Sequence, residues 1–336
     1  MADQDQSNPL SPYRSDGKLY GFVCIVTGAT SPIGKAIVAE LAAHGAACVY
    51  ACSASPSDDF ASLADGVNEQ FPNTKVIGYP FRNASEEDTL GLIDDALNAW
   101  GRLDIYVATS VLHGPSSISE TTPNDLIKLF EANSMAAFFA LKYAPPAMQK
   151  LSPQKSYPNA SPKPQPYGSI IVVTTTASIN GGSSNHGPAL TMSSHAALGV
   201  VKAGVSVLKG TGVRINCVSA GDVDDGSKSA AAEMSGSGKT EGSERVGLPV
   251  EVARVAGFLA SGFSSYVSGT NMVVDGGRST GLSVGPMKSG GTLTVECITC
   301  WSRSPTQAYE HRDCKLKHQY YLHLISPPHM EAPAVL

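Results

Sequence analysis

The sequence predicts an α/β protein with a doubly wound, Rossmann-like parallel sheet of about seven strands and helices on both faces. Three observations predict this fold class. Short apolar runs rich in β-branched residues alternate with longer segments of helical period. The first run, Phe22–Val26, is apolar and rich in β-branched residues, as expected of a buried parallel strand. The 336 residues, 42% of them hydrophobic, suffice for one such domain of roughly 250 residues plus flanking segments.

The strand-like runs occur seven times. We expect strands at Phe22–Val26, Ala47–Ala51, Lys75–Tyr79, Leu103–Ala108, Ser169–Thr174, Arg214–Val218 and Asn271–Val274. Apolar residues at helical spacing predict helices at Gly34–Ala43, Glu86–Trp100, Pro123–Met148, Ser194–Leu208 and Pro249–Leu259. Strands that alternate with helices pair in parallel, because each helix returns the chain to the same edge of the sheet.

The pattern divides the chain into three parts. Residues 1–18 have no apolar core and indicate a disordered lead-in, and residues 19–278 carry the alternating pattern. Residues 279–336 have no sustained period and are expected to be an appended tail. Within the domain, Leu151–Tyr167 contains five prolines, which predicts a surface loop.

Composition and charge exclude several classes of function. The formal net charge is −5 and no basic stripe is present, so we expect no nucleic-acid partner. No apolar run approaches the ~18 residues that span a bilayer, and the N-terminus lacks a signal core, so we expect no membrane partner. Of the seven cysteines, Cys24, Cys48 and Cys217 lie in strand-like runs, which favours buried thiols in a reducing compartment. The predicted location is the cytoplasm.

A metal site is not expected. Cys297 and Cys300 form one C-x-x-C pair, with Cys314, His311, His318 and His323 nearby, which imitates a zinc site. A single pair without a matching second pair is weak, and the segment around it lacks a folded framework. A divergent tail is the favoured interpretation.

The residues Thr27 to Gly34 join the first strand to the first helix through a turn of small side chains. Such a turn presents backbone N–H groups and the positive end of a helix dipole to a phosphate. Pro32 removes one N–H but has the φ angle of a first helical turn, so it is compatible with this site. The alternative is a tight strand-to-helix turn that binds no ligand.

Six segments, in order along residues 19–278, carry a resemblance to a known family. They are T-G-x-x-x-x-I-G at 27–34, W-G-R-L-D-I at 100–105, E-A-N-S at 131–134, G-S-I-I-V-V-T-T at 168–175, G-T-G-V-R-I-N-C-V-S-A-G at 210–221 and V-V-D-G-G at 273–277. The chain resembles a fungal-type short-chain dehydrogenase/reductase. One glycine of the family's T-G-x-x-x-G-x-G turn is replaced by Pro32.

The resemblance implies an enzyme that binds a nicotinamide cofactor and a small-molecule substrate, and forms a homo-oligomer, a dimer or tetramer. The cofactor-binding residues that it implies are Gly28, Ser31, Ile33, Gly34, Ser53, Asn133, His195 and Val223. An acidic residue after the second strand would select NAD, but none occurs before Asp58. NADP(H) is therefore favoured, with NAD as the alternative.

The family's catalytic residues are only partly present. Its tyrosine and lysine correspond to Thr191 and His195, and its strand serine to Thr175. An aliphatic hydroxyl is too weak an acid to deliver a proton unaided, whereas histidine titrates near pH 6.5, so His195 is the candidate acid or base. The alternative is a histidine that only packs on its helix, with His186 as a rival proton donor.

Other family positions also differ or have two interpretations. Asn133 matches the family's helix asparagine. It has two interpretations: a member of a proton relay, or a structural polar residue that fills a helix bulge. The family's N-N-A-G is residues 108–111 here, and Arg82 occupies the place of an aspartate. Asp222, Asp224 and Asp225 follow Gly221, where a carboxylate binds a cationic substrate or simply faces solvent.

Three functions remain open on the sequence. The first is an NADP(H)-dependent oxidoreductase that acts on a carbonyl or imine, or on an alcohol or amine, in fungal secondary-metabolite biosynthesis. The second is a non-redox cyclase, isomerase or dehydratase on the same fold. The third is a non-catalytic binding protein. Loss of the Tyr/Lys pair favours the last two, and retention of the nucleotide turn and Asn133 favours the first.

Overall fold

The structure, a computed structural model, describes Arg14, residues 16–54, 59–82, 84–109 and 111–152, Tyr157, and residues 162–180, 186–224 and 245–279. All of these residues belong to one compact unit that ends at Ser283. The expected tail, apart from Ser279, and the first 13 residues of the expected lead-in lie outside the described residues. None of the described helices is long and apolar enough to cross a membrane.

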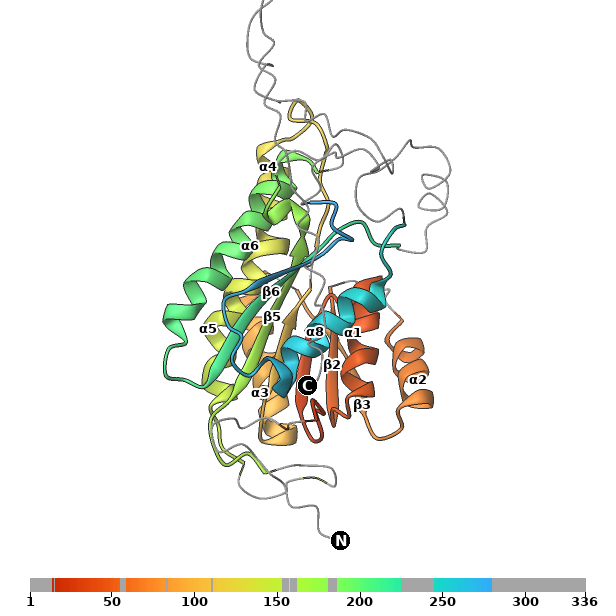
Figure 1. Cartoon of the computed structure of the whole chain (residues 1–336), viewed down its shortest axis with the longest axis vertical. Coiled ribbons are helices and arrows are strands. Elements are labelled where there is room, and N and C mark those ends of the chain that lie inside the picture. Colours follow the sequence, from red (N-terminus) through yellow and green to blue (C-terminus); the bar gives the residue numbers. More distant parts are fainter. Residues whose placement is uncertain are drawn as a thin grey trace, which may run out of the picture. The chain divides into compact units, whose positions relative to one another are not determined.

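The seven predicted strands are present and form one parallel sheet, which confirms the predicted fold class (Figure 1). The order across the sheet is β3-β2-β1-β4-β5-β6-β7. The strands are β1 (Val23–Thr27), β2 (Cys48–Ser53), β3 (Lys75–Pro80), β4 (Ile105–Ala108), β5 (Gly168–Thr175), β6 (Val213–Ala220) and β7 (Asn271–Val274). The order reverses between β1 and β4, and the carboxyl edge at such a reversal is where doubly wound sheets bind ligands.

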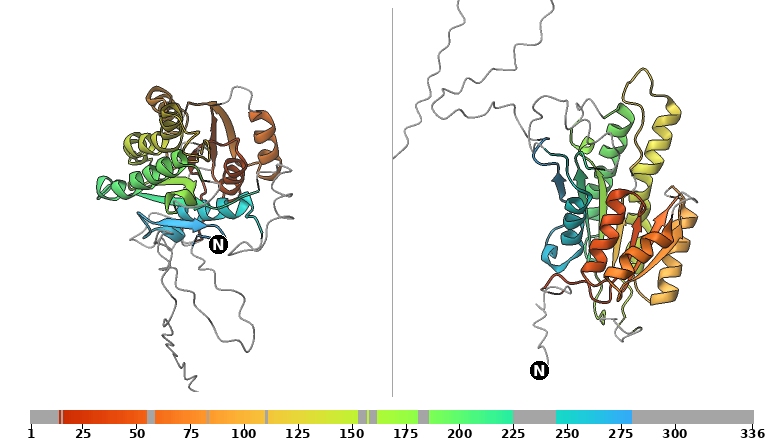
Figure 2. Two further views of the ribbon diagram at one scale, coloured as in Figure 1. Left: turned by 90° about the horizontal axis from the view of Figure 1, so that it is seen from above. Right: turned by 90° about the vertical axis from the view of Figure 1, so that its right-hand side faces the viewer.

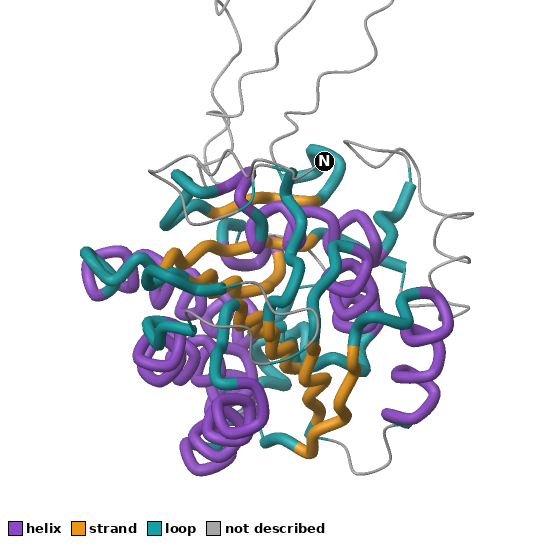
Figure 3. Tube along the Cα trace, turned by 90° about the horizontal axis from the view of Figure 1, so that it is seen from below, coloured by secondary structure: helices purple, strands orange, loops and turns teal. Residues whose placement is uncertain are grey.

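Helices cover both faces of the sheet, as the views in Figures 2 and 3 show. The helices are α1 (Pro32–Ala43), α2 (Phe60–Gln70), α3 (Glu86–Trp100), α4 (Pro123–Phe130), α5 (Ala136–Met148), α6 (Pro188–Val207) and α8 (Pro249–Ala260). The apolar sides of α1, α2 and α8 form one buried cluster with the sheet, and those of α3, α5 and α6 form another. The strands β1, β2, β4 and β6 are buried over their whole length, and most of their residues are apolar. The polar residues of β6, Arg214, Asn216 and Ser219, are buried with hydrogen-bond partners.

Three helices differ from the sequence prediction. The helix α2 was missed, although Phe60, Leu63, Ala64 and Val67 recur in it at helical spacing and Val67 is buried. The helix α6 begins at Pro188, six residues earlier than expected, because small residues in its first turns gave no helical period. The expected single helix over Pro123–Met148 is α4 and α5 separated by a π-helical segment, Glu131–Met135. Such a segment inserts one extra residue into the helix.

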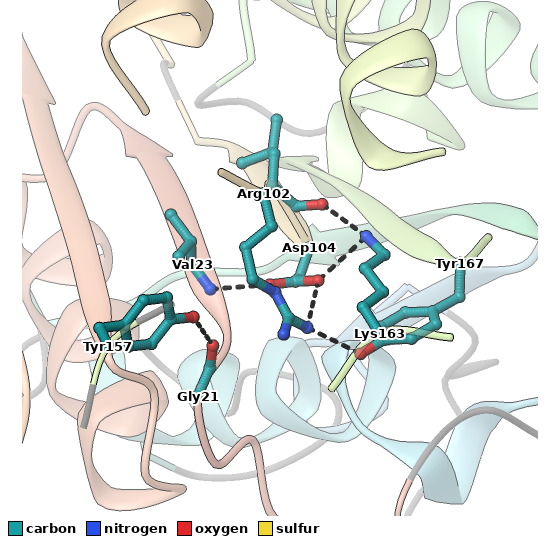
Figure 4. Close-up of polar contacts among 8 residues, drawn as sticks. Gly21, Val23, Arg102, Asp104, Tyr157, Lys163 and Tyr167 are labelled. Atoms are coloured by element: carbon teal, nitrogen blue, oxygen red, sulfur yellow. Dashed lines mark hydrogen bonds and ion pairs between the residues drawn. The ribbon is translucent and has the colours of Figure 1, made fainter. Parts of the chain in front are cut away.

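The prediction that Leu151–Tyr167 is a surface loop is wrong for part of this segment. Lys163 and Tyr167 are buried, and Lys163 pairs with Ser152 in an antiparallel bridge. Figure 4 shows the reason: the Lys163 ammonium contacts the buried carboxylate of Asp104 at the start of β4. The prolines indicated a loop correctly, but the partner that draws it inward lies 59 residues away in the sequence.

Asp104 is the centre of a buried ionic network at the amino end of the sheet (Figure 4). Its carboxylate accepts two hydrogen bonds from Arg102, at 2.8 and 2.9 Å, one from Lys163 at 3.1 Å and one from the Val23 N–H at 2.9 Å. Arg102 also donates to the Tyr167 hydroxyl at 2.8 Å. The network therefore connects β1, β4 and the proline-rich loop at one point.

Candidate functional site

The turn between β1 and α1 is held by the side chain of Ser31. Its hydroxyl donates to the Gly28 carbonyl at 2.8 Å and accepts from the Gly34 N–H at 3.1 Å, so Ser31 is the N-cap of α1. Gly28 has a φ of +61°, which a glycine adopts without strain. A Cβ on Gly34 would lie 2.1 Å from the Gly28 carbonyl oxygen, so the turn closes on itself there.

This turn retains the features of a phosphate site although Pro32 replaces a glycine. Pro32 is the first residue of α1, where a missing N–H costs nothing. The Ile33 N–H lies in the first helical turn, which has no intrahelical acceptors. The turn therefore places an N–H without an acceptor in its own helix, and the positive end of a helix dipole, at the carboxyl end of β1, next to β4.

The carboxyl end of β2 lies next to this turn. The Thr30 hydroxyl donates to the Ser53 hydroxyl at 3.0 Å, which ties the turn to the last residue of β2. No described residue directly after β2 carries a carboxylate. Arg82, expected in place of a family aspartate, lies beyond β3 and forms a bidentate ion pair with Asp88, with hydrogen bonds of 2.9 and 2.6 Å.

Asn133 lies in the π-helical segment, and both the oxygen and the nitrogen of its amide form hydrogen bonds. It accepts from the Leu112 N–H at 2.6 Å and donates to the Leu112 carbonyl and the Ser193 hydroxyl, both at 3.0 Å. The side chain thus connects the loop after β4 to α6. These contacts match the structural interpretation, and a role in a proton relay stays a prediction.

Thr175, at the end of β5, has its hydroxyl beside α6. The hydroxyl accepts from the Ala177 N–H at 3.2 Å and lies 3.3 Å from the Ser194 hydroxyl. Thr175 is half-buried and is the last residue of β5, so it lies at the carboxyl edge of the sheet. Its expected role, to orient a substrate oxygen, stays a prediction.

Thr191 and His195 lie one turn apart on α6. The Thr191 hydroxyl is buried without a hydrogen-bond partner. His195 is exposed, and its Nδ1 donates to the Thr191 carbonyl at 2.9 Å. A carbonyl cannot donate, so Nδ1 carries the proton and Nε2 is the nitrogen left for a ligand.

The segment after β6 lies beside the end of β7. Val223 pairs with Gly247 in a parallel bridge, and the Arg278 guanidinium forms an ion pair with Asp222 at 2.8 Å. Asp222 is therefore occupied by a cation of the chain itself. Asp225 lies outside the described residues. The same holds for the cysteines and histidines that imitate a zinc site in the sequence: Cys297, Cys300, Cys314, His311, His318 and His323.

Several polar residues of this region were missed by the sequence prediction. Ser193 and Ser194 bond to Asn133 and Thr175, and Thr109 follows β4 with a buried, unpartnered hydroxyl. Ser193 and Ser194 lie in the sequence between Thr191 and His195, so their position next to these candidate residues could have indicated that they belong to the site. The sequence prediction names Thr109 only as one of residues 108–111, in place of the family's N-N-A-G, and gives it no role.

Comparison with known proteins gives consistent matches. A family profile described as enoyl-(acyl carrier protein) reductase matches residues 28–279. L-rhamnose-1-dehydrogenase of Scheffersomyces stipitis is 28% identical over 269 residues, 78% of this chain and 97% of that protein. (+)-Borneol dehydrogenase 2 of Salvia officinalis is 30% identical over 289 residues, 81% of this chain and 94% of that protein. Momilactone A synthase of Oryza sativa subsp. japonica is 30% identical over 275 residues, 78% of this chain and 91% of that protein.

Among solved structures, a short-chain type dehydrogenase/reductase from Mycobacterium marinum superposes with a TM-score of 0.67. The superposition covers 79% of this chain and 98% of that chain, at 22% sequence identity. At this identity the likeness shows the fold.

Proposed function

The chain belongs to the short-chain dehydrogenase/reductase family, a family of oxidoreductases, and on that premise we propose that it is an NADP(H)-dependent oxidoreductase of small molecules. The substrate pair is a carbonyl and its alcohol, or an imine and its amine, in fungal secondary-metabolite biosynthesis. Relatives named as dehydrogenases of borneol and of L-rhamnose support an alcohol as the oxidised group.

The geometry of the turn from Thr27 to Gly34 carries this proposal. The capped start of α1 and the Ile33 N–H, which has no acceptor within its helix, suit a pyrophosphate. The turn closes tightly at Gly34, as a phosphate turn does, although Pro32 replaces the family's middle glycine. Gly28, Ser31, Ile33 and Gly34 would hold the pyrophosphate. Ser53 would lie at the adenosine ribose, and Asn133, His195 and Val223 nearer the nicotinamide.

The preference for NADP(H) is supported by the end of β2. Ser53 offers a hydroxyl to a 2′-phosphate, and no described neighbour after β2 would repel it. A bound nicotinamide cofactor supplies or accepts a hydride. The protein must then orient the substrate oxygen, for which Thr175 is suited, and exchange a proton with it. For that proton Thr191 and His195 are the candidates at the family positions.

The non-redox alternative is favoured by one observation. Thr191 stands where the family has its proton donor, and its hydroxyl is a weak acid. A cyclase, isomerase or dehydratase, or a non-catalytic binding protein, needs no such donor. Binding of the reduced cofactor separates these functions from the oxidoreductase.

We also expect a cytoplasmic homo-oligomer, a dimer or a tetramer. Exposed apolar side chains on α4, α5 and α6 support assembly: Ile127, Phe130, Phe138, Met192, Val205 and Val207. A groove of about 420 Å³ between α4, the π-helical segment and α6 adds to this apolar surface. A second copy of the chain would cover it.

Titration with NADPH and NADH, followed by nicotinamide fluorescence, tests the proposal. Ser53→Asp should weaken NADPH binding by about tenfold or more, roughly 1.4 kcal/mol, because its carboxylate repels the 2′-phosphate. NADH affinity should change by less than about threefold. Ser265→Asp, an exposed serine before β7, is the matched control and should change neither affinity. A wild-type protein that binds neither nucleotide at millimolar concentration would refute the oxidoreductase.

A further inference from the structure

His186 lies where three loops at the carboxyl edge of the sheet converge. It precedes Gly187, the N-cap of α6, on the connection that follows β5. Gly187 is packed so closely on the loop after β4 that a Cβ would lie 1.8 Å from the Pro115 carbonyl oxygen. The charges that act on the His186 imidazole come from His113, after β4, and Asp222, after β6. His186 therefore belongs to the same edge of the sheet as Thr175.

Within the described part of the chain, no hydrogen-bond partner contacts the imidazole of His186. Its Nδ1 is buried and unpartnered, and neither ring nitrogen is bonded to another part of the described chain. A histidine that serves only packing has its buried nitrogen satisfied in most proteins. An unsatisfied ring nitrogen costs stability, which points to a partner that arrives with a ligand.

From this placement we propose that His186 is the group that exchanges a proton with the substrate oxygen. The proposal deepens the proposed function and rests on it, since it names the acid and base of the same site. Thr191, at the family's tyrosine position, is left as a hydrogen-bond donor to that oxygen. The ligand class is a secondary alcohol or the corresponding ketone.

The proton balance in the direction of oxidation is simple. The substrate O–H bond breaks and its proton passes to a ring nitrogen of neutral His186. The carbon–hydrogen bond breaks with its electron pair, which leaves as the hydride that an oxidised nicotinamide dinucleotide takes up, and the C=O bond forms. The imidazolium then releases its proton to water. In the direction of reduction each step is reversed, and imidazolium donates the proton.

The surroundings of His186 suit a base at neutral pH. Burial lowers the pKa of His186, while the Asp222 carboxylate raises it and His113 lowers it. Arg278 pairs with Asp222 at 2.8 Å and offsets part of the charge of that carboxylate. The neutral form therefore predominates above a pKa that lies below the ordinary 6.5.

His195 is the rival for this role, and its contacts are different. His195 is exposed, with Nδ1 committed to the Thr191 carbonyl, whereas the buried Nδ1 of His186 has no partner among the described residues. His195 then remains for the cofactor ribose, as expected at the family's lysine position. The two histidines can be separated by substitution.

The first arm of the test is an NMR titration of the histidine imidazoles of the full-length protein, without ligand. His186 should titrate below pH 6.5. Asp222→Asn should lower its pKa further, because a negative charge is removed, and His113→Gln should raise it. If His186 has a pKa near the ordinary 6.5 and neither substitution changes it, the proposed cluster is overturned.

The second arm measures oxidation of borneol by NADP⁺ as a function of pH. Turnover should rise through the same pKa that NMR gives for His186. His186→Gln should remove this inflection and lower turnover by about 10²- to 10⁴-fold, with NADPH binding unchanged. His113→Gln, the exposed neighbour, should shift the inflection without removing it.

The outcomes separate the two proposals. If the wild type fails to bind NADPH, the proposed function is lost, while the NMR arm still decides whether the cluster exists. If NADPH binds and His186→Gln keeps turnover within about threefold with the same inflection, His186 is not the proton-exchanging group. If His195→Gln loses the inflection in the pH profile and His186→Gln keeps it, the role belongs to His195. NADPH binding without turnover of borneol would also overturn the role of His186.

Discussion

A single carboxylate organises the amino end of the sheet. Asp104 is buried between two cations, Arg102 and Lys163, and accepts a backbone hydrogen bond from β1. Burial opposes its ionisation, but the charges of Lys163 and Arg102 hold the pKa of Asp104 below its usual range. Breaking such a pair from one side leaves buried charges without a partner.

Asp104→Asn should therefore lower the free energy of unfolding by about 3–5 kcal/mol, as measured by urea denaturation. The substitution keeps the shape of the side chain but leaves the charges of Arg102 and Lys163 facing an amide. Asp94→Asn on α3, an exposed carboxylate, is the matched control and should change stability by less than ~0.5 kcal/mol. Equal effects of the two substitutions would show that the network does not stabilise the fold.

The same residue predicts how stability depends on pH. The pKa of Asp104 is lower in the folded chain than the ~3.9 of an unfolded one, so its contribution is present above that value. It is lost as pH falls through the folded pKa. Between about pH 5 and pH 2 the wild type should lose stability more steeply than Asp104→Asn. The free energy of unfolding of both proteins is measured by urea denaturation at several pH values. An equal dependence on pH in the wild type and Asp104→Asn would contradict this prediction.

At the scale of elements, the nucleotide turn offers a test of binding that leaves the fold intact. Gly34→Asp cannot serve, because a Cβ there would collide with the Gly28 carbonyl whether or not a ligand binds. Ser31 is better placed, since asparagine and aspartate are both good N-caps. The two differ mainly in charge.

Ser31→Asp should weaken NADPH binding by about tenfold or more, because its carboxylate would face the pyrophosphate. Ser31→Asn is the matched control and should stay within about threefold of wild type. Both variants should unfold at the wild-type temperature. Equal affinities of the two variants, measured by nicotinamide fluorescence, would place the phosphate elsewhere.

Two glycines inside helices predict opposite changes in stability. Gly66 in α2 is exposed and a Cβ there would meet nothing, so Gly66→Ala should raise the free energy of unfolding by about 0.5–1 kcal/mol. Gly204 in α6 faces the sheet, and a Cβ there would lie 3.0 Å from Ile215 and 3.2 Å from Leu141. Gly204→Ala should lower the same quantity, since overpacking outweighs helix propensity. If both substitutions raise the free energy of unfolding, the side chains around Gly204 can move to accommodate a Cβ.

At the scale of the whole molecule, the two edges of the sheet have different tasks. The amino edge contains the Asp104 network, and the carboxyl edge contains Ser31, Thr175 and His186. The parallel arrangement brings the carboxyl ends of all strands to one edge, which explains why residues so far apart in the sequence can form one site. Substitutions at the two edges should therefore affect stability and binding separately.

The expected division of the chain can be tested by truncation. Ser279 is bonded to Asp275 and to Asn180, so the cut belongs after Ser283, where the compact unit ends. A chain of residues 1–283 should keep its free energy of unfolding within about 0.5 kcal/mol of the full chain, and its NADPH affinity as well. A loss of several kcal/mol in thermal or urea unfolding would show that the tail is part of the core.

The sequence by itself determined the fold class and most strands of this protein. Strands buried on both faces are mostly apolar, and their alternation with helices favours a parallel sheet. The phosphate turn was also visible, because its residues are consecutive. Local patterns of this kind depend on neighbours within one element. The prediction overlooked one of them, the helical spacing of Leu63, Ala64 and Val67 in α2.

Only the tertiary structure decided which distant polar groups meet. Lys163 lies in a stretch that its prolines marked as a surface loop, and it is buried because Asp104 is a partner there. Asn133 was visible as a family position, but its contacts with Leu112 and Ser193 were not. The unpartnered nitrogen of His186 is likewise a property of three converging loops. Burial of a polar group is decided by the partners that packing supplies, and a one-dimensional pattern does not contain them.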